Sequence, residues 1–300
     1  MIGFLIKIIF SFINHRYTIN KIVLISNNGI LVTGASGFIG SYLLQAAEND
    51  SIPFIGLSRS KESNNLFKVK TYFELDDYIK DDQICIHLAG NNNIESIDAD
   101  EIKLLEHLSD IYRSKLIYIS SSYVYGCNYK IPIYETDNIS ITNNYSSRKI
   151  DCENIVMRNS GIVIRLSNVY GSRMSNNIFN HIYSELVKKN NSVHIKNGYN
   201  IRDFINISDV CSALLLIAKN MKSGIYNLST GKGTSIFNLC ELFANHLNIK
   251  KKSYEIISSS IDDTMMVLNS DKLKKEFSWK PVIDLNSGIE AWINNYENNI

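Results

Sequence analysis

The chain has 300 residues, 45% of them hydrophobic and 20% charged, and its formal net charge at pH 7 is +1. This composition predicts a globular protein with one large domain, or one domain and a smaller lobe. The near-neutral charge gives no electrostatic reason to expect nucleic acid or an anionic membrane as a partner. The five cysteines are widely spaced and form no CxxC pair, so we expect no metal site and a reducing, cytoplasmic environment.

The N-terminal extension, residues 1–28, stands apart from the rest of the sequence. Its apolar run, residues 1–13, is too short to span a bilayer, contains Lys7, and is not followed by a small-residue cleavage site. Two interpretations stay open: an amphipathic helix that packs or touches a membrane surface, or sequence upstream of the true start. We favour the second, and expect no firm membrane association.

From residue 30 onward, short β-branched runs alternate with longer amphipathic runs. We expect strands at 30–33, 53–58, 68–73, 84–89, 116–120, 162–167 and 225–229, and helices at 38–49, 99–113, 144–159 and 177–190. Nearly continuous apolar strands separated by helices predict a Rossmann-like, doubly wound parallel α/β sheet with helices on both faces. The alternation becomes less regular after Gly171, which predicts an additional lobe at the carboxyl ends of the strands.

A glycine-rich turn, GASGFIG, follows the first predicted strand. Its first glycine permits a tight turn, the second lets the backbone approach a pyrophosphate, and the third lets the helix pack closely on the strand. The pyrophosphate would lie at a helix N-terminus, where unpaired amides favour negative charge. The turn therefore predicts dinucleotide binding by Gly34, Ser36, Gly37, Phe38, Ile39 and Gly40. We assign residues 29–171, with 203–229, to a dinucleotide-binding domain, and residues 172–202 and 230–300 to a substrate-binding lobe.

Two further segments suggest acid–base chemistry. In YSSRK, Tyr145 and Lys149 are four residues apart and share one face of a predicted helix. A free tyrosine titrates near ~10, and a nearby cation stabilises its phenolate, which makes proton exchange with a hydroxyl feasible at neutral pH. Upstream, LIYISSSYVYG ends a predicted strand in a run of hydroxyl groups that includes Ser121.

These motifs resemble the extended branch of the short-chain dehydrogenase/reductase family, the NAD(P)-dependent nucleotide-sugar epimerases, dehydratases and 4-ketoreductases. The resemblance covers nearly all of the chain from residue 29, including IHLAG (86–90), RLSNVYG (165–171) and IRDFINISDV (201–210). It implies an oxidoreductase in which hydride passes between a nicotinamide and a sugar carbon. By the same resemblance, Ser121 would bind the reacting oxygen, Tyr145 would exchange the proton, and Lys149 would lower the tyrosine pKa and hold the ribose.

The resemblance also implies further contacts. Cofactor contacts are expected from Ser58, Arg59, Leu88, Ala89, Gly90, Ser120, Tyr145 and Lys149, in addition to the glycine turn. Substrate contacts are expected from Ser122, Asn168 and Arg202, the last because a forked guanidinium suits a diphosphate. A homodimer is expected through a two-helix face that includes residues 145–156.

Departures from the family pattern narrow the reaction. The second strand ends in Ser58-Arg59 and lacks the acid that binds the ribose 2′-hydroxyl of NAD, so NADP(H) is favoured over NAD(H), unless Arg59 is simply solvated. Dehydratases of the family have a threonine followed by Asp-Glu where this chain has Ser121 and then Ser122-Tyr123, so dehydration is disfavoured. We favour a 4-ketoreductase acting on a nucleotide-linked 4-keto-6-deoxyhexose in surface polysaccharide biosynthesis. The alternatives are an NAD-dependent 4-epimerase, and a non-catalytic nucleotide-sensing or scaffold protein of the same fold.

One more departure concerns the catalytic lysine. The family often has an asparagine on the helix after the fourth strand, which supports the lysine through water. Alignment on Leu104-Leu105 places Ile97 and Asp98 at that position. We therefore expect the support to be rearranged, or to come from residues 91–93, which are all asparagines.

Overall fold

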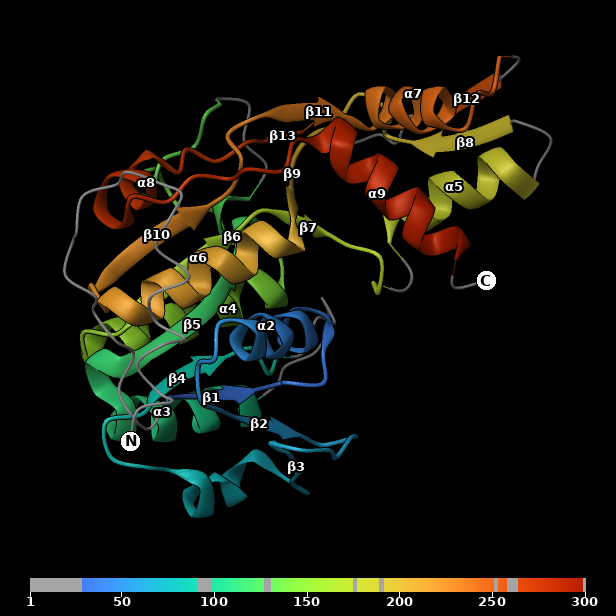
Figure 1. The fold of residues 1–300 in the computed structure, drawn as a ribbon. Coiled ribbons are helices and arrows are strands. Elements are labelled where there is room, and N and C mark those ends of the chain that lie inside the picture. Colours follow the sequence, from blue (N-terminus) through green and yellow to red (C-terminus); the bar gives the residue numbers. More distant parts are fainter. Residues whose placement is uncertain are drawn as a thin grey trace, which may run out of the picture.

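The computed structural model describes residues 29–90, 99–126, 131–174, 177–188, 192–250, 253–257 and 264–298 (Figure 1). Its main sheet has seven strands in the order β10-β6-β5-β4-β1-β2-β3. They are β1 (Ile30–Thr33), β2 (Phe54–Ser58), β3 (Leu66–Lys68), β4 (Ile84–His87), β5 (Leu116–Ser121), β6 (Ile162–Leu166) and β10 (Gly224–Leu228). Every neighbouring pair is parallel. The Rossmann-like, doubly wound fold predicted from the sequence is confirmed.

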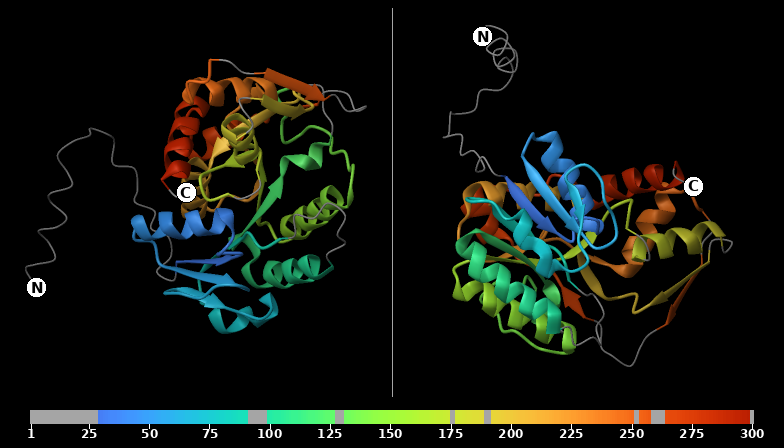
Figure 2. Two further views of the ribbon diagram at one scale, coloured as in Figure 1. Left: turned by 90° about the vertical axis from the view of Figure 1, so that its right-hand side faces the viewer. Right: turned by 90° about the horizontal axis from the view of Figure 1, so that it is seen from below.

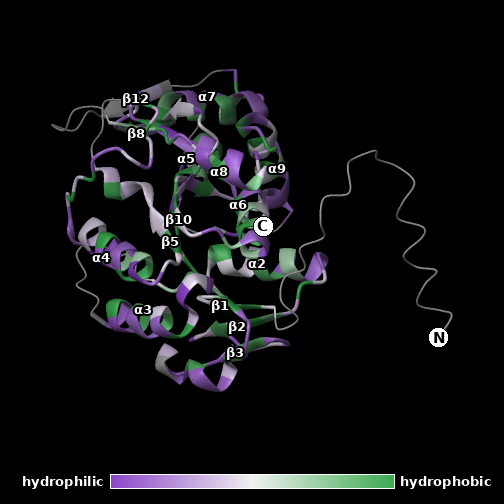
Figure 3. Ribbon diagram, turned by 90° about the vertical axis from the view of Figure 1, so that its left-hand side faces the viewer, coloured by the Kyte–Doolittle hydropathy of each residue, from purple (hydrophilic) through white to green (hydrophobic). Residues whose placement is uncertain are grey.

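Helices cover both faces of this sheet because successive strand side chains point to opposite sides. Ile30 and Val32 of β1 face a core shared with α2 (Phe38–Asn49) and α6 (Ile207–Asn220). Leu31, between them, faces a core shared with α3 (Ala99–Tyr112) and α4 (Asn144–Arg158). Figure 3 shows the apolar strands between these helices, whose outer faces carry many hydrophilic residues.

The predicted strand at 68–73 is wrong in position. Strand β3 ends at Lys68, and Tyr72–Tyr78 form a 3-10 helix, η1. The Glu74 carboxylate accepts a hydrogen bond from the Lys70 backbone N–H at 3.0 Å, which turns the chain out of the sheet. The β-branched run at 68–73, which predicted a strand, therefore reflects a single buried side chain, Val69, followed by a turn.

The remaining elements form a lobe at one end of the molecule (Figure 2). Strand β9 (Ile201–Asn206) pairs with β7 (Asn168–Tyr170), β11 (Gly233–Ser235) and β13 (Met265–Met266), and β8 (Ser192–Lys196) pairs with β12 (Ser253–Ile257). Helices α5 (Ile178–Lys188), α7 (Ile236–His246) and α9 (Leu285–Glu297) enclose an aromatic core that contains Tyr170, Phe179, Phe243 and Trp292.

Three short elements complete the fold: α8 (Asp271–Phe277) and the 3-10 helices η2 (Arg113–Lys115) and η3 (Ser122–Tyr125). Helix α8 lies within the range 230–300 that the sequence assigns to the lobe. Its Leu273 and Phe277, with the following Trp279, nevertheless pack into the core between the main sheet and α6. By these contacts α8 belongs with the sheet.

Some of the sequence-based expectations fall on residues outside the described part of the chain. These are the extension 1–28, Cys127, the asparagines at 91–93, Ile97 and Asp98. Within the described ranges, no helix is both long enough and apolar enough to cross a membrane.

Candidate active site

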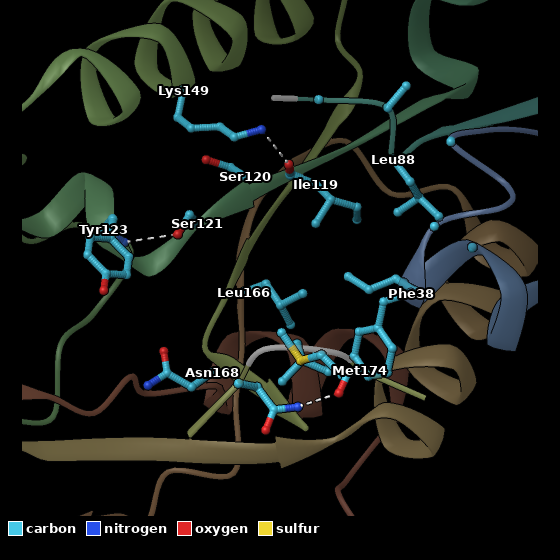
Figure 4. A pocket seen from close by; sticks show the side chains of 18 of the residues that line it. Phe38, Leu88, Ile119, Ser120, Ser121, Tyr123, Lys149, Leu166, Asn168 and Met174 are labelled. Atoms are coloured by element: carbon cyan, nitrogen blue, oxygen red, sulfur yellow. Dashed lines mark hydrogen bonds between the residues drawn. The ribbon is translucent and has the colours of Figure 1, made fainter. Parts of the chain in front are cut away.

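A cavity of about 770 Å³ lies at the carboxyl ends of the main-sheet strands, against the lobe. Its wall is formed by the glycine turn after β1, the ends of β2, β4, β5 and β6, helix α4, and the start of α5 (Figure 4). The volume is typical of a site for a cofactor or small ligand, and open α/β sheets bind ligands at this edge. The sheet topology therefore places the predicted motifs around one space.

The glycine turn forms the part of the wall next to β4. Gly34 has φ of +68°, and a Cβ on it would lie 2.7 Å from the Ala89 backbone nitrogen. A Cβ on Gly40 would lie 2.5 Å from the Gly34 carbonyl oxygen. Gly37 is the N-cap of α2 and, being glycine, provides no side-chain cap. The first-turn amides of α2 are thus available to an anion, as the motif predicts.

The end of β2 carries a cluster of hydroxyl groups. The buried Ser58 Oγ donates to Ser36 Oγ at 2.6 Å and accepts from the backbone N–H groups of Ser60 and Lys61, each at 3.1 Å. Ser36 and Ser60 line the cavity, whereas Ser58 lies behind them. Ser58 therefore holds the turn in shape, and Ser36 and Ser60 present its hydroxyl surface.

Arg59 lies beside this cluster and also lines the cavity. Its guanidinium lies 5.7 Å from the ring centroid of Tyr72, within the range of a cation–π contact. The Tyr72 hydroxyl accepts a hydrogen bond from the Gly34 N–H at 3.1 Å. Tyr72 thus links the arginine to the glycine turn.

Ser121, Tyr145 and Lys149 all line the cavity. Helix α4 begins with a capping box in which Asn143 and Ser146 satisfy each other's backbone amides. This cap fixes the first turn of α4, so that Tyr145 and Lys149 face the end of β5. Ser121 is the last residue of β5, and its Oγ accepts from the Tyr123 N–H at 3.2 Å.

Lys149 is held by protein groups behind the cavity wall. Its ammonium donates to the Tyr118 hydroxyl at 2.9 Å and to Glu101 Oε1 at 3.2 Å. It also donates to the Ile119 carbonyl at 3.4 Å (Figure 4). The ammonium lies 5.7 Å from the ring centroid of Tyr145. A cation is thereby fixed next to the tyrosine, as acid–base use of the phenol requires.

Ser120 also lines the cavity, and it anchors the end of β5. Its Oγ donates to Glu153 Oε1 at 2.5 Å, and Glu153 pairs with the buried Arg165 at 2.7 Å. Arg165 also donates to the Tyr125 hydroxyl at 3.0 Å. This buried network joins β5, α4 and β6 beneath the cavity.

The model of the NAD-dependent epimerase/dehydratase family matches residues 30–229, two thirds of the sequence. The match includes the glycine turn, the end of β5 and all of α4. The chain belongs to this family. The protein therefore belongs to an enzyme family with an NAD(P)-binding Rossmann domain. This agrees with the resemblance of its sequence to the extended short-chain dehydrogenase/reductases.

Family relatives differ in the reaction that their names give. A putative UDP-glucose 4-epimerase of Methanocaldococcus jannaschii is 29% identical over 304 residues, covering 90% of this chain and 99% of the relative. The CDP-abequose synthase of Salmonella typhimurium is 27% identical over 301 residues, covering 87% and 96%. A dTDP-4-dehydro-6-deoxyglucose reductase of Escherichia coli is 24% identical over 316 residues, covering 89% and 96%. Relatives named as an epimerase and as a reductase are thus both similar to this chain along nearly its whole length.

Solved structures of the family share the fold. A UDP-N-acetylglucosamine 4-epimerase from Methanobrevibacter ruminantium, in complex with UDP-N-acetylmuramic acid, has a TM-score of 0.80 at 21% identity, covering 91% of this chain and 99% of that one. RMD from Pseudomonas aeruginosa, complexed with NADPH, has a TM-score of 0.77 at 20% identity, covering 91% and 100%. The two solved structures thus share the fold of nearly the whole chain, including the lobe.

Not every residue that the family pattern suggests for substrate lines the cavity. Asn168 does, whereas Ser122 is buried and is not among the lining residues. Arg202 also lies outside the lining: its guanidinium donates to the Thr264 carbonyl at 2.8 Å and to Thr264 Oγ1 at 2.7 Å. The roles assigned to Ser122 and Arg202 from the sequence remain predictions.

Several lining residues were missed by sequence reasoning. They are Ser60, Tyr72, Ile119, Tyr123, Leu166, Ser167 and Val169, and on the lobe side Met174, Asn177, Ile178, Phe179 and Phe204. Tyr123 lies edge-on to Tyr145, with ring centroids 6.2 Å apart. Tyr123 follows Ser121 by two residues in η3. The run of serines at the end of β5 therefore could have indicated from the sequence that Tyr123 lies at the site. The lobe residues had no such signal, because the fold of the lobe brings them to the cavity.

Proposed function

We propose that this protein is an NADP(H)-dependent nucleotide-sugar 4-ketoreductase acting on a nucleotide-linked 4-keto-6-deoxyhexose. The observation that carries the proposal is the end of β2, where a serine cluster and Arg59 stand in place of an acid. A reductase consumes its dinucleotide and draws on NADPH, whereas an epimerase recycles the dinucleotide that it holds.

The β2 terminus suits a 2′-phosphate on chemical grounds. Ser36 and Ser60 provide hydroxyl donors on the cavity wall, and Arg59 provides a permanently charged, forked donor. An Asp or Glu there would accept from a ribose hydroxyl and repel the phosphate. RMD, solved with NADPH, shows that the fold accommodates this cofactor in another member.

The arrangement of Ser121, Tyr145 and Lys149 supports carbonyl reduction. When bound, the nicotinamide supplies the hydride that adds to sugar carbon four. Tyr145 gives its hydroxyl proton to the carbonyl oxygen of the sugar, and Ser121 donates a hydrogen bond to the same oxygen. Lys149 stabilises the phenolate that remains on Tyr145. Apolar side chains at the cavity, such as Leu166 and Phe179, limit the access of water.

Dehydration receives no support from the lining. Elimination of water requires a carboxylate near the sugar as acid or base. Among the described residues, those that line the cavity include no Asp or Glu. Tyr123 occupies the wall where the family's dehydratases carry an acid.

A 4-epimerase is the second candidate, favoured by the 29% identity to a putative UDP-glucose 4-epimerase.

To test which reaction the protein catalyses, the purified protein is incubated with NADPH or NADH and a panel of nucleotide 4-keto-6-deoxyhexoses. The proposal predicts stoichiometric loss of NADPH with one of them and slower loss of NADH. No consumption, with tightly held NAD carried through purification and interconversion of a UDP-hexose, would identify the epimerase instead.

A further inference from the structure

A buried carboxylate, Glu101, lies directly behind the catalytic lysine. It belongs to the first turn of α3 and contacts two consecutive residues of α4. Glu101 Oε2 accepts from Arg148 Nε at 2.8 Å, and Oε1 accepts from Lys149 Nζ at 3.2 Å. The side chains of Glu101, Arg148 and Lys149 are only 3%, 4% and 7% exposed. Such a cluster is well shielded from solvent, so its charges interact strongly.

The carboxylate lies against the wall of the cofactor cradle. A Cβ on Gly90, which lines the cavity, would lie 3.0 Å from Glu101 Oε1 and 3.4 Å from Lys149 Nζ. Glu101 itself does not line the cavity. It therefore acts on the site through Lys149.

The cluster also sets the charge around the tyrosine. The Arg148 guanidinium and the Lys149 ammonium lie 5.6 and 5.7 Å from the ring centroid of Tyr145. Burial opposes ionisation of Glu101, but the adjacent Lys149 and Arg148 charges outweigh it and hold the pKa of Glu101 below its usual value. One negative charge thus faces two cations beside the phenol.

Among the described residues, the other buried titratable groups that interact with Glu101 are neutral. On β5, burial raises the pKa of Tyr118 far above its usual value, so Tyr118 remains a phenol. On β4, burial lowers the pKa of His87 to about 4, so its imidazole carries no charge at neutral pH. On α4, burial raises the pKa of the Cys152 thiol to about 12. The charge balance next to Tyr145 therefore depends on Glu101, Arg148 and Lys149.

We propose that Glu101 is a positioning residue, which holds the Lys149 ammonium against the dinucleotide ribose and limits the positive charge that acts on Tyr145. The proposal rests on the proposed function in so far as Lys149 and Tyr145 serve a bound dinucleotide and a keto sugar. It gives this chain a direct carboxylate support for the lysine from α3, three residues before Leu104.

Three variants test the proposal: Glu101→Gln removes the charge, Glu101→Asp retains it on a shorter side chain, and Glu106→Gln is a matched control on an exposed part of α3. NADPH affinity is measured by fluorescence titration, and turnover is measured across pH. We expect Glu101→Gln to weaken NADPH binding by about tenfold, because Lys149 loses a charged partner. Its turnover should also decline with rising pH about one pH unit earlier, since the added net positive charge stabilises the phenolate of Tyr145.

Glu101→Asp separates the two effects. It should restore the wild-type pH at which turnover declines and still bind NADPH more weakly, because the shorter carboxylate cannot keep its contact with Lys149. Wild-type affinity and pH dependence in both Glu101 variants would overturn the proposal. If Glu101→Gln does not fold, Glu101→Asp decides, and unchanged NADPH affinity in it would overturn the proposal.

The binding measurement separates this proposal from the proposed function. Wild-type protein that binds NADPH and reduces no keto sugar would contradict the reductase, while the affinities of the variants would still test the role of Glu101. Wild-type turnover with no difference between Glu101→Gln and Glu106→Gln would contradict the role of Glu101 and leave the reductase intact.

Discussion

The proposed chemistry centres on Tyr145, the side chain that we propose transfers the proton. It lines the cavity beside Ser121, and Lys149 is held behind it by Tyr118, Glu101 and the Ile119 carbonyl. In the proposed mechanism its hydroxyl gives a proton to the substrate oxygen, because Tyr145 has the Lys149 ammonium 5.7 Å from its ring centroid. This arrangement separates proton transfer, at Tyr145, from charge support, at Lys149.

Replacing Tyr145 with Phe should lower turnover on the order of 10²–10⁴-fold, the usual contribution of a positioned acid. NADPH affinity should stay near the wild-type value, because the ring that remains fills the same space. Turnover is followed by NADPH absorbance, with the exposed Tyr134→Phe as control. Unchanged turnover in Tyr145→Phe would contradict the assignment. Absence of NADPH oxidation in the wild type, together with no interconversion of a UDP-hexose, would favour a nucleotide-sensing or scaffold protein.

Replacing Arg59 with Ala tests the proposed preference for NADPH over NADH. The loss of a charged donor from the β2 terminus should weaken NADPH binding by about tenfold or more and leave NADH binding nearly unchanged. Lys80→Ala removes an exposed cation outside the cavity wall and serves as control. Equal losses for both dinucleotides would show that Arg59 does not distinguish the 2′-phosphate.

At the scale of elements, the site depends on how β5, α4 and β6 are joined. Arg165 of β6 donates to Glu153 of α4 at 2.7 Å, and Glu153 in turn accepts from Ser120 of β5. All three side chains are buried. The pair therefore fixes the distance between the Ser121 end of β5 and the helix that carries Tyr145.

Replacing Glu153 with Gln should lower the free energy of unfolding by roughly 3–5 kcal/mol, because the Arg165 charge loses its buried partner. Urea denaturation measures the loss. Asp151→Asn, an exposed change on the same helix, should leave the free energy of unfolding within about 0.5 kcal/mol of the wild-type value. A small effect of Glu153→Gln would mean that water replaces the carboxylate.

The elements were largely predictable because their signals are local. The helix expected at 38–49 has those bounds, and the helix expected at 144–159 ends one residue earlier. The strand expected at 68–73 was misplaced, because the Glu74 contact that ends it is a side-chain interaction which alternation does not reveal. The glycine turn and the Tyr145–Lys149 spacing could also be recognised from the sequence, because each lies within a few consecutive residues.

Other parts of the site could not be read from the sequence. Glu101 reaches Lys149 only because α3 and α4 lie side by side on one face of the sheet. Phe179 and Phe204 reach the cavity through the packing of the lobe. These positions follow from tertiary contacts between segments far apart in the chain, which neither periodicity nor motif spacing encodes.

At the scale of the whole molecule, stability is linked to pH through His87. This histidine is fully buried at the end of β4, where Nδ1 and Thr33 Oγ1 share a hydrogen bond of 2.8 Å. Within the described part of the chain, its Nε2 has no hydrogen-bond partner. Burial lowers the pKa of His87 to about 4, below the 6.5 of a free histidine.

This shift predicts acid destabilisation. Between about pH 4 and 6.5 the unfolded chain binds a proton at His87 that the folded protein does not, so the contribution of His87 to stability rises with pH through this window. Asp203, whose pKa burial raises to about 6, contributes with the opposite sign, so the comparison with a His87 variant isolates the histidine. The contribution of His87 is complete above about pH 6.5, and roughly 3 kcal/mol is lost as the pH falls to about 4. Chemical denaturation at a series of pH values should show a smaller slope for His87→Phe than for the wild type. The exposed His181→Gln should keep the wild-type slope, and an equal slope in His87→Phe would contradict the assignment.

In the proposed reaction, the sheet and the lobe together bring a keto sugar to the hydride of NADPH. It is tested most directly by supplying NADPH deuterated at the transferable position of nicotinamide carbon four, with a nucleotide 4-keto-6-deoxyhexose, and locating the label by NMR. We predict one deuterium at sugar carbon four for each NADPH consumed. Loss of NADPH without deuterium at sugar carbon four, or no loss of NADPH with any of the keto sugars, would contradict the reductase.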